Sequence, residues 1–333
     1  MIPPYSPQPG PDSPIAAATQ RVKLSHDGEV YDLLGIYFVN MLLTIVTLGI
    51  YRFWAKTRIR RYLWSHTEFL EDRFEYTGTG KELLIGFLIV LAILAVTVGA
   101  YTLIFTSIWP GWASDIELGI LYQLPLFIAS FPLVAIARFR ARRYRLSRTL
   151  WRGIRGSQSG SSSHYGVLSA GCWLLTFFTL GFYWPYMQTR LVSYRLNHTW
   201  FGDRAVTFDG NGDDLIGYYA VCWLLTLPTL GMCWFWYRAR SLQYYASRTA
   251  YATLGFKVTI TGGTLINLIS TNLILIWFSF GLAYPFVLRR NASYLCTYLS
   301  LVGDQDFALI VQSLKLRPTT GEGMAEAFDI GDF

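Results

Sequence analysis

The chain has 333 residues, of which 53% are hydrophobic and only 15% are charged. Soluble domains carry about 45–50% apolar and about 25% charged residues. This composition excludes a soluble enzyme, a collagen-like chain and a disulfide scaffold. The net charge is +7, but the basic residues follow apolar runs, which is typical of charge flanking a membrane segment. We therefore expect contact with membrane lipids and no nucleic acid partner.

The two ends of the sequence differ from the rest in composition. Residues 1–20 are rich in Pro, Ser and Ala and lack the basic and apolar regions of a signal peptide. We expect a disordered Pro-rich tail there. Residues 315–333 are predicted to form an acidic C-terminal tail, because they end in GEGMAEAFDIGDF.

Six stretches between these tails contain no Asp, Glu, Lys or Arg. They are residues 33–51, 83–114, 118–137, 156–189, 215–237 and 258–288. Each has at least about 18 predominantly apolar residues, enough for a helix to cross the hydrocarbon layer of a bilayer. The sequence therefore predicts a multi-pass membrane protein.

A pattern with a period of fifty residues runs through these stretches. Three copies are LLTIVTLGIYRFWAKTRIRRY (42–62), LLTFFTLGFYWPYMQTRLVSY (174–194) and LLTLPTLGMCWFWYRARSLQY (224–244), with a weaker copy at 273–294 and a degenerate one around Phe131. The glycines that serve as origins are Gly49, Gly181 and Gly231 in the three clear copies and Gly281 in the weaker copy. We predict about five internal repeats within a transmembrane domain at 21–314, with units at 22–72, 73–155, 156–204, 205–256 and 257–314.

Polar connectors at 22–34, 73–84, 205–216 and 257–266 alternate β-branched or aromatic residues and contain glycine before the next apolar run, which indicates a strand and a turn. If each apolar run were one crossing, equivalent connectors would alternate between compartments. A helical hairpin that turns at the TLG glycine instead returns every connector to one side. We therefore predict an all-α polytopic membrane protein of helical hairpins, with short β-strand connectors on the cytoplasmic side. Some hairpins would be re-entrant, because the arms are short.

An arginine follows each origin by nine residues and is the candidate ligand contact. These residues are Arg58, Arg140, Arg190, Arg240 and Arg290. They serve either as interfacial anchors or as parts of a basic cavity for an anionic headgroup or ligand. We favour the anchor.

The sequence shows no residues for catalysis. The repeat position of His66 and His198 is occupied by Arg148 and Arg248 in other copies, so a proton-transfer role is not required there. No metal-ligand, nucleophile or phosphate-loop motif is present. We expect no enzymatic activity, no cofactor and no metal.

The TLGIYRFWAKTRIRRY and FEYTGTGKELL segments, the LLTxxTLG pattern, RTLWRGIRG (148–156) and GEGMAEAFDIGDF (321–333) resemble a bacterial inner-membrane family of unknown function, the YjgN-like proteins. The resemblance implies a location in the bacterial inner membrane and supplies no reaction. Three functional classes remain, of which an intramembrane enzyme is the least favoured because no catalytic residues are visible. Two are favoured. One is binding or transport of a small or lipid molecule, because transporters are often built from repeats. The other is a scaffold whose cytoplasmic strands and tails bind an unidentified protein partner.

Overall fold

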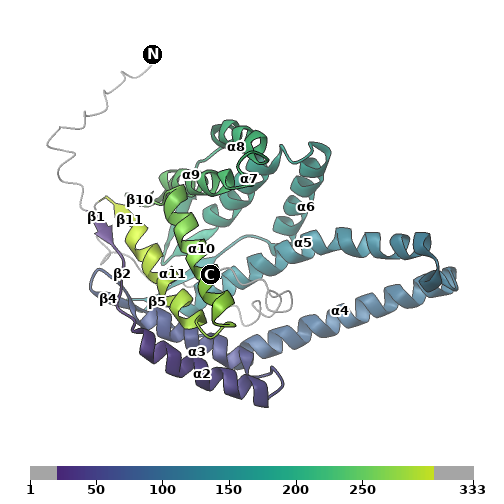
Figure 1. Cartoon of the computed structure of the whole chain (residues 1–333), viewed down its shortest axis with the longest axis horizontal. Helices are drawn as coiled ribbons and strands as arrows, with labels where there is room; N and C mark the ends of the chain where they lie inside the picture. Colours follow the sequence, from purple (N-terminus) through teal and green to yellow (C-terminus); the bar gives the residue numbers. More distant parts are fainter. Residues whose placement is uncertain (1–20, 304–333) are drawn as a thin grey trace.

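The computed structural model describes residues 21–303. This part of the chain alternates strands with pairs of helices (Figure 1). The helices are α2 (Val30–Val46), α3 (Arg52–Ser65), α4 (Gly80–Ile108), α5 (Ile116–Arg148), α6 (Ser162–Phe178), α7 (Trp184–Asn197), α8 (Asp213–Leu225), α9 (Cys233–Ser247), α10 (Gly262–Phe278) and α11 (Tyr284–Tyr298). A short 3-10 helix, η1 (Trp112–Ser114), lies between α4 and α5.

Eleven strands form one antiparallel sheet with the order β1-β11-β10-β9-β8-β7-β6-β5-β4-β3-β2. The strands are β1 (Arg21–Lys23), β2 (Ser25–His26), β3 (Thr67–Phe69), β4 (Asp72–Tyr76), β5 (Thr149–Trp151), β6 (Ile154–Gln158), β7 (Thr199–Phe201), β8 (Arg204–Phe208), β9 (Thr249–Tyr251), β10 (Leu254–Val258) and β11 (Leu299–Val302). The two ends of this order, β1 and β2, are separated by Leu24 alone. The sheet therefore nearly closes into a barrel, which leaves few unpaired edge groups.

This sheet makes the prediction of an all-α fold wrong. The reason lies in the short segments that follow α3, α5, α7 and α9, each of which pairs with the longer strand after it through a two-residue turn. In one such turn, Arg152 and Gly153 have φ values of 50° and 72°, the left-handed conformation that fits the twist of a hairpin. The protein is a helical protein built on a nearly closed antiparallel sheet.

Each five-residue strand is shared between two neighbours. In β8, Arg204 and Ala205 pair with β7, and the residues from Val206 onward pair with β9. The strand β6 divides in the same way between β5 and β7. Because each five-residue strand pairs with one neighbour along its first part and with the other along the rest, the short strands form one continuous, nearly closed sheet.

Tight turns join the two helices of four pairs. Gly181 has φ of 92°, and its N–H donates to the carbonyl of Thr176 (2.7 Å), as in a helix that ends on a left-handed glycine. The residue before the glycine is also left-handed, with φ of 51° at Leu180. Gly49, Gly231 and Gly281 occupy the same position in the turns α2–α3, α8–α9 and α10–α11.

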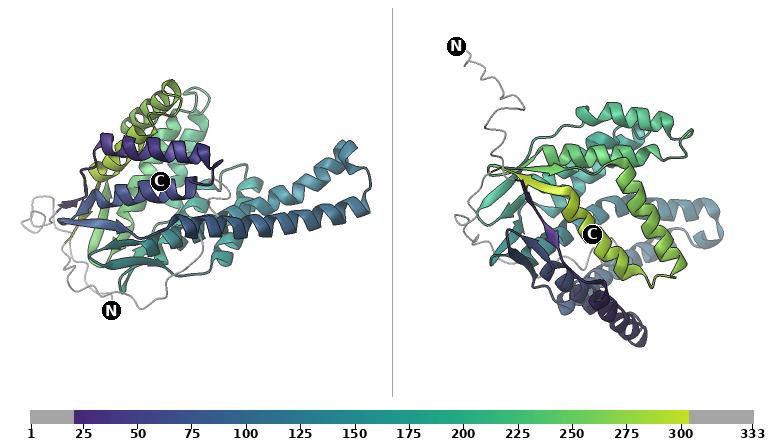
Figure 2. Two further views of the ribbon diagram at one scale, coloured as in Figure 1. Left: turned by 90° about the horizontal axis from the view of Figure 1, so that it is seen from below. Right: turned by 60° about the vertical axis from the view of Figure 1, so that its left-hand side comes forward.

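Two of the described helices, α4 with 29 residues and α5 with 33, are long and apolar enough to cross a membrane. Only 17% and 11% of their apolar windows are buried, so they are not core helices of a soluble protein. Figure 2 shows this pair extending away from the strands, well beyond the other helices. The six apolar runs therefore do not all become full spans. A 17-residue helix such as α2 is only about 26 Å long.

The helices close into a ring above the sheet, because α11 packs against α2. Two hydrogen bonds join these distant segments: the hydroxyl of Tyr37 donates to the carbonyl of Gly281 (3.2 Å), and Nε of Arg289 donates to the carbonyl of Gly28 (2.7 Å). Inside the sheet, an apolar cluster gathers Phe69, Trp151, Tyr251, Leu254 and Leu301. The strands that connect the helix pairs are thus held together by a packed apolar cluster.

Candidate functional site

A cavity of about 950 Å³ lies among α2, α3, α5, α7 and α11. We call it the central cavity. Most of its wall comes from α2 and α3, with side chains of Tyr284 and Leu288 from α11. Because these helices come from both ends of the described chain, the cavity exists only once the ring is closed.

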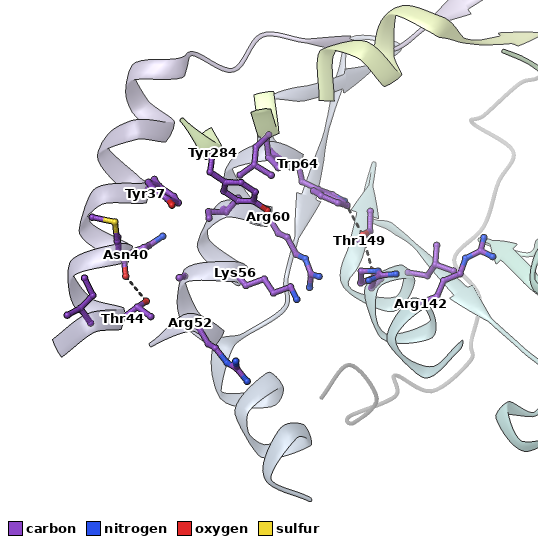
Figure 3. Close-up of a pocket in the computed structure, with 18 of the residues that line it drawn as sticks. Tyr37, Asn40, Thr44, Arg52, Lys56, Arg60, Trp64, Arg142, Thr149 and Tyr284 are labelled. Atoms are coloured by element: carbon purple, nitrogen blue, oxygen red, sulfur yellow. Dashed lines mark hydrogen bonds between the residues drawn. The ribbon is translucent and has the colours of Figure 1, made fainter. Parts of the chain in front are cut away.

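Six basic side chains line the central cavity: Arg52, Lys56, Arg60, Arg142, Arg145 and Arg195. The first three are spaced by four residues along α3, so they share one face of that helix. Figure 3 shows their side chains extending from α3 toward the side on which Arg142 lies. Among the residues described as lining the cavity there is no Asp or Glu. The wall is therefore strongly electropositive and suited to an anion.

The positive charges lie close enough to repel one another. Arg142 is within electrostatic range of Arg145 and Arg195. Arg60 is only 6% exposed, and its Nη1 donates to the hydroxyl of Tyr76 (3.4 Å). The cavity wall therefore concentrates positive charge from three helices, α3, α5 and α7.

Asn40 adds an unsatisfied polar group to the same wall. Its side chain is 2% exposed, and within the described chain neither the amide nitrogen nor the amide oxygen has a hydrogen-bond partner. Figure 3 shows the amide of Asn40 directed from α2 toward α3. A buried polar group without a partner costs about 1–3 kcal/mol, so this position favours a polar ligand.

Apolar side chains complete the cavity. Met41 and Ile45 come from α2, Ile59 and Leu63 from α3, and Leu146 from α5. The indole Nε1 of Trp64, which also lines the wall, donates to Oγ1 of Thr149 (3.0 Å) and fixes α3 against β5. The combination of cations and apolar surface suits a ligand with both an anionic and an apolar part.

The five arginines predicted from the sequence lie outside this cavity. Arg140 donates from Nε to Oγ of Ser162 (3.1 Å), and Arg240 lies over the ring of Tyr218 at 5.0 Å. Arg190 lies 5.8 Å from the ring of Tyr183. Arg58 is exposed and Arg290 is half-buried. The predicted arginines lie nine residues after the origin of each copy. Arg52, Lys56 and Arg60 lie three, seven and eleven residues after Gly49 and therefore occupy a different face of the helix. The roles of the five predicted arginines as anchors or ligand contacts stay predictions.

The sequence did contain a signal for three of the six basic residues of the cavity. Basic residues four apart in RFWAKTRIR mark one helix face of α3. No comparable signal joins Arg142 and Arg195, which lie on different helices, α5 and α7.

The carboxylates of Glu82 and Asp214 do not pair with the predicted arginines. Glu82 accepts from Nη2 of Arg148 at 2.6 Å, and Asp214 lies 3.5 Å from Nη2 of Arg248. Each pair joins the first turn of one helix to the end of the next helix. These ion pairs stabilise the base of a hairpin.

Comparisons with known proteins identify the family. A family model described as a bacterial protein of unknown function, DUF898, matches residues 21–236 and 218–327. The chain belongs to this family. The resemblance inferred from the sequence is thereby confirmed.

Curated relatives share the name inner membrane protein YjgN. The protein of Escherichia coli O157:H7 is 30% identical over 152 residues, which cover 45% of this chain and 32% of the relative. The protein of Salmonella typhimurium is 42% identical over 62 residues, covering 19% of this chain and 16% of the relative. The matches thus span about a third or less of the relatives' own length. Their names support a location in the bacterial inner membrane. No solved structure matches the chain.

Proposed function

We propose that this protein is an integral protein of the bacterial inner membrane that binds an anionic amphiphile in its central cavity. The membrane part of the proposal is supported by the family, by the names of the relatives and by the two long apolar helices. The ligand part rests on one observation: six basic side chains line one cavity together with apolar side chains and the buried amide of Asn40.

Exposed apolar turns support insertion of the shorter hairpins as re-entrant elements. The residues before the turn glycines are exposed by 93% at Leu48, 82% at Leu180, 93% at Leu230 and 96% at Phe280. Four bulky apolar side chains at the tips of helix pairs are costly in water and favourable in lipid. We place these tips in the bilayer. The strands and both termini then lie on the cytoplasmic side, following the excess of basic residues near them.

The size and chemistry of the central cavity define the ligand class. A volume of about 950 Å³ is at the upper end of the range for small-molecule sites. Arginine recognises phosphate and carboxylate through paired N–H groups, and the apolar wall accepts hydrocarbon. An anionic headgroup with at least part of an acyl chain meets both requirements. Binding is the proposed activity, and transport would require a second open state.

The test is binding of short-chain phosphatidylglycerol to the full chain in a neutral detergent, read by native mass spectrometry. Phosphatidylcholine of the same chain length and inorganic phosphate serve as comparison probes. Arg60→Gln, Arg142→Gln and Arg195→Gln remove cavity charges. Arg58→Gln and Arg190→Gln remove the same charge outside the cavity and are the matched controls.

We expect each cavity variant to weaken phosphatidylglycerol binding by at least about tenfold, since a hydrogen bond to a charged group contributes about 1.5–3 kcal/mol. The controls should bind as the wild type does. Preference for inorganic phosphate over the lipid would assign the site to a free anion. Equal binding of the zwitterionic and anionic lipids, or equal losses in controls and cavity variants, would overturn the proposal.

A further inference from the structure

The α4–α5 pair departs from the other helix pairs at the position of the turn. Fifty residues after Gly49 the sequence has Gly99, which lies in α4. Fifty residues before Gly181 it has Phe131, which lies in α5. The other four pairs turn at this point, whereas both helices of the α4–α5 pair continue through it. Residues 99–131 are therefore an addition to the repeated unit, and we call them the extension.

Buried positions support this alignment. Val90, nine positions before Gly99, is buried, and so is the residue nine positions before the turn glycine in each of the other pairs. These residues are Asn40, Cys172, Cys222 and Asn272. In the second helix, Phe139 lies eight positions after Phe131 and is buried, as is Thr189 at the same distance from its turn glycine. The α4–α5 pair thus packs like its neighbours up to the level of the turns, and the extension projects beyond them (Figure 2).

The end of the extension differs chemically from the four short turns. It carries two carboxylates, Asp115 and Glu117, and a connection at residues 109–115 in which Gly111 has φ of 86°. Each short turn has the sequence Thr-Leu-Gly or Ser-Phe-Gly and presents an exposed Leu or Phe side chain. Carboxylates and irregular backbone are unfavourable in hydrocarbon, whereas exposed leucine and phenylalanine are favourable there. The end of the extension therefore belongs among headgroups or in water, and the short turns belong in the bilayer.

Aromatic side chains with polar atoms gather near the same end. The ring of Tyr122 stacks on that of Trp112, with centroids 4.3 Å apart, and on that of Tyr101 at 5.2 Å. The hydroxyl of Tyr101 donates to the carbonyl of Tyr122 (3.0 Å), and Nε1 of Trp112 donates to Oγ1 of Thr106 (3.1 Å). Tyrosine and tryptophan concentrate at membrane–water interfaces, because one end of each side chain is apolar and the other is polar. This cluster therefore marks the level of an interface.

Length and charge place that interface on the side opposite the sheet. The helix α4 rises about 40 Å between Lys81 and Ile108, which exceeds the thickness of a hydrocarbon core, about 30 Å. The helix α8 has 13 residues and rises only about 20 Å. Between Lys81 and Arg138 the sequence contains no Lys or Arg. A connection without basic residues, flanked by basic residues on both sides, is typical of a segment that faces away from the cytoplasm.

We propose that the extension crosses the leaflet opposite the sheet and binds the periplasmic headgroup layer through its aromatic end, while the other four helix pairs end inside the bilayer. The orientation rests on the membrane placement in the function proposed above. The partner of this surface is a lipid surface. The protein then contacts both headgroup layers, the near one through basic residues such as Lys81 and Arg138 and the far one through Tyr101, Trp112 and Tyr122.

The first test is the accessibility of single cysteines to a membrane-impermeant maleimide. Ala113→Cys lies at the end of the extension, Leu227→Cys at a short turn and Thr207→Cys on the sheet, and all three positions are exposed. The wild type, whose four cysteines are buried, gives the background. We expect Ala113→Cys to react in intact spheroplasts, Thr207→Cys only after the inner membrane is permeabilised, and Leu227→Cys in neither preparation.

Three results of this labelling would overturn the proposal. Ala113→Cys that reacts only after permeabilisation would place the extension on the cytoplasmic side. Ala113→Cys that reacts in neither preparation would place its end in hydrocarbon. Reaction of Leu227→Cys in intact spheroplasts would show that a short pair also crosses the membrane.

The second test compares the same carboxylate at two kinds of helix-pair end. Ile116, at the end of the extension, is 81% exposed, and Leu227, at a short turn, is 87% exposed. We expect Leu227→Asp to lower the amount of folded protein in the membrane fraction several-fold, because a carboxylate is unfavourable in hydrocarbon. Ile116→Asp should match the wild type. Equal amounts of the two variants would contradict the difference between the two kinds of end.

This proposal and the proposed ligand fail in different ways. Labelling requires no ligand, and lipid binding in detergent requires no orientation in a membrane. The predicted labelling without binding of phosphatidylglycerol would leave the extension in place and refute the ligand. Binding that depends on Arg60, with no labelling of Ala113→Cys, would do the reverse. Labelling of Thr207→Cys in intact spheroplasts would refute both the orientation and the periplasmic contact.

Discussion

The hydroxyl of Tyr244 near the end of α9 donates a 2.6 Å hydrogen bond to Oδ2 of Asp214 in the first turn of α8. Its oxygen also lies 2.9 Å from the carbonyl of Asn211, just before that helix. A tyrosine in the second helix contacts the start of the first helix in every helix pair. The equivalent contacts are Tyr62 to the carbonyl of Glu29, Tyr144 to Glu82, Tyr194 to the carbonyl of Ser161 and Tyr294 to Thr264. These tyrosines, which follow the candidate arginines by four residues, fasten the base of each pair.

Replacing Tyr244 with Phe should lower the stability of the protein. The change removes a hydrogen bond to a carboxylate and keeps the ring, so we expect a loss of about 1–2 kcal/mol in the free energy of unfolding. Chemical unfolding in detergent, followed by circular dichroism, measures it. Tyr31→Phe is the control, because Tyr31 is 83% exposed. Equal stability of Tyr244→Phe and Tyr31→Phe would contradict the role of the hydroxyl.

Two glycines of one helix pair should respond to alanine with opposite signs. Gly231 lies in the turn with φ of 80°, where a Cβ costs roughly 1–2 kcal/mol. Gly217 lies inside α8, and nothing lies within 4 Å of the position of an added Cβ. Gly217→Ala should be neutral or stabilise by about 0.5–1 kcal/mol through helix propensity. Unfolding of the two variants under one condition compares them, and a stabilising Gly231→Ala would show that the turn differs from the one described.

Local patterns in the sequence located part of this fold. Strands β4 and β8 lie almost wholly in connectors whose alternation predicts strands, whereas β10 overlaps its connector only at Lys257 and Val258; the family is confirmed. The three-residue strands β3, β5, β7 and β9 were missed, because so short a segment has no period to detect. The signal that could have indicated them is a threonine, any residue and then an aromatic one before each two-residue turn, as in Thr67–Phe69 and Thr149–Trp151.

Non-local contacts decide the rest, and they have no local signature. Closure of the sheet pairs Arg21 with Val302, residues from opposite ends of the described chain. The central cavity depends on the same closure, because it brings Leu288 of α11 to the face of α3 that carries Arg60. The repeated arginines were more conspicuous in the sequence, since they recur at one spacing. The repeated arginines recur because the helix pairs have similar sequences. The basic residues that line the cavity do not recur in every helix pair.

Acidification should weaken the junction at which the sheet closes. Burial is the main cause that lowers the pKa of His26 from 6.5, followed by the charge of His66; Arg289 acts in the same direction and Asp27 in the opposite one. The unfolded chain therefore binds a proton as the pH falls below about 6.5, while the folded protein resists protonation, so stability falls. The free energy of unfolding should decrease between pH 8 and pH 5. His26→Asn should show a smaller decrease, and an identical pH dependence in both proteins would refute this assignment.

Lysine substitution separates the two arginine sets. Arg58, Arg190, Arg240 and Arg290 lie outside the central cavity, and an anchor of this kind needs charge and length, which lysine also provides. Arg58→Lys and its counterparts should therefore leave both stability and bound lipid nearly unchanged.

Inside the cavity the expectation is the reverse. Arg60→Lys and Arg142→Lys keep the charge but lose the planar group that binds phosphate through two N–H donors. We expect each to lose about tenfold in affinity for short-chain phosphatidylglycerol with little change in melting temperature. Native mass spectrometry of all six single variants compares the two sets in one experiment. An anionic species lost from Arg190→Lys or Arg240→Lys, with melting unchanged, would place a ligand site on the outer face of the helices and overturn the anchor interpretation.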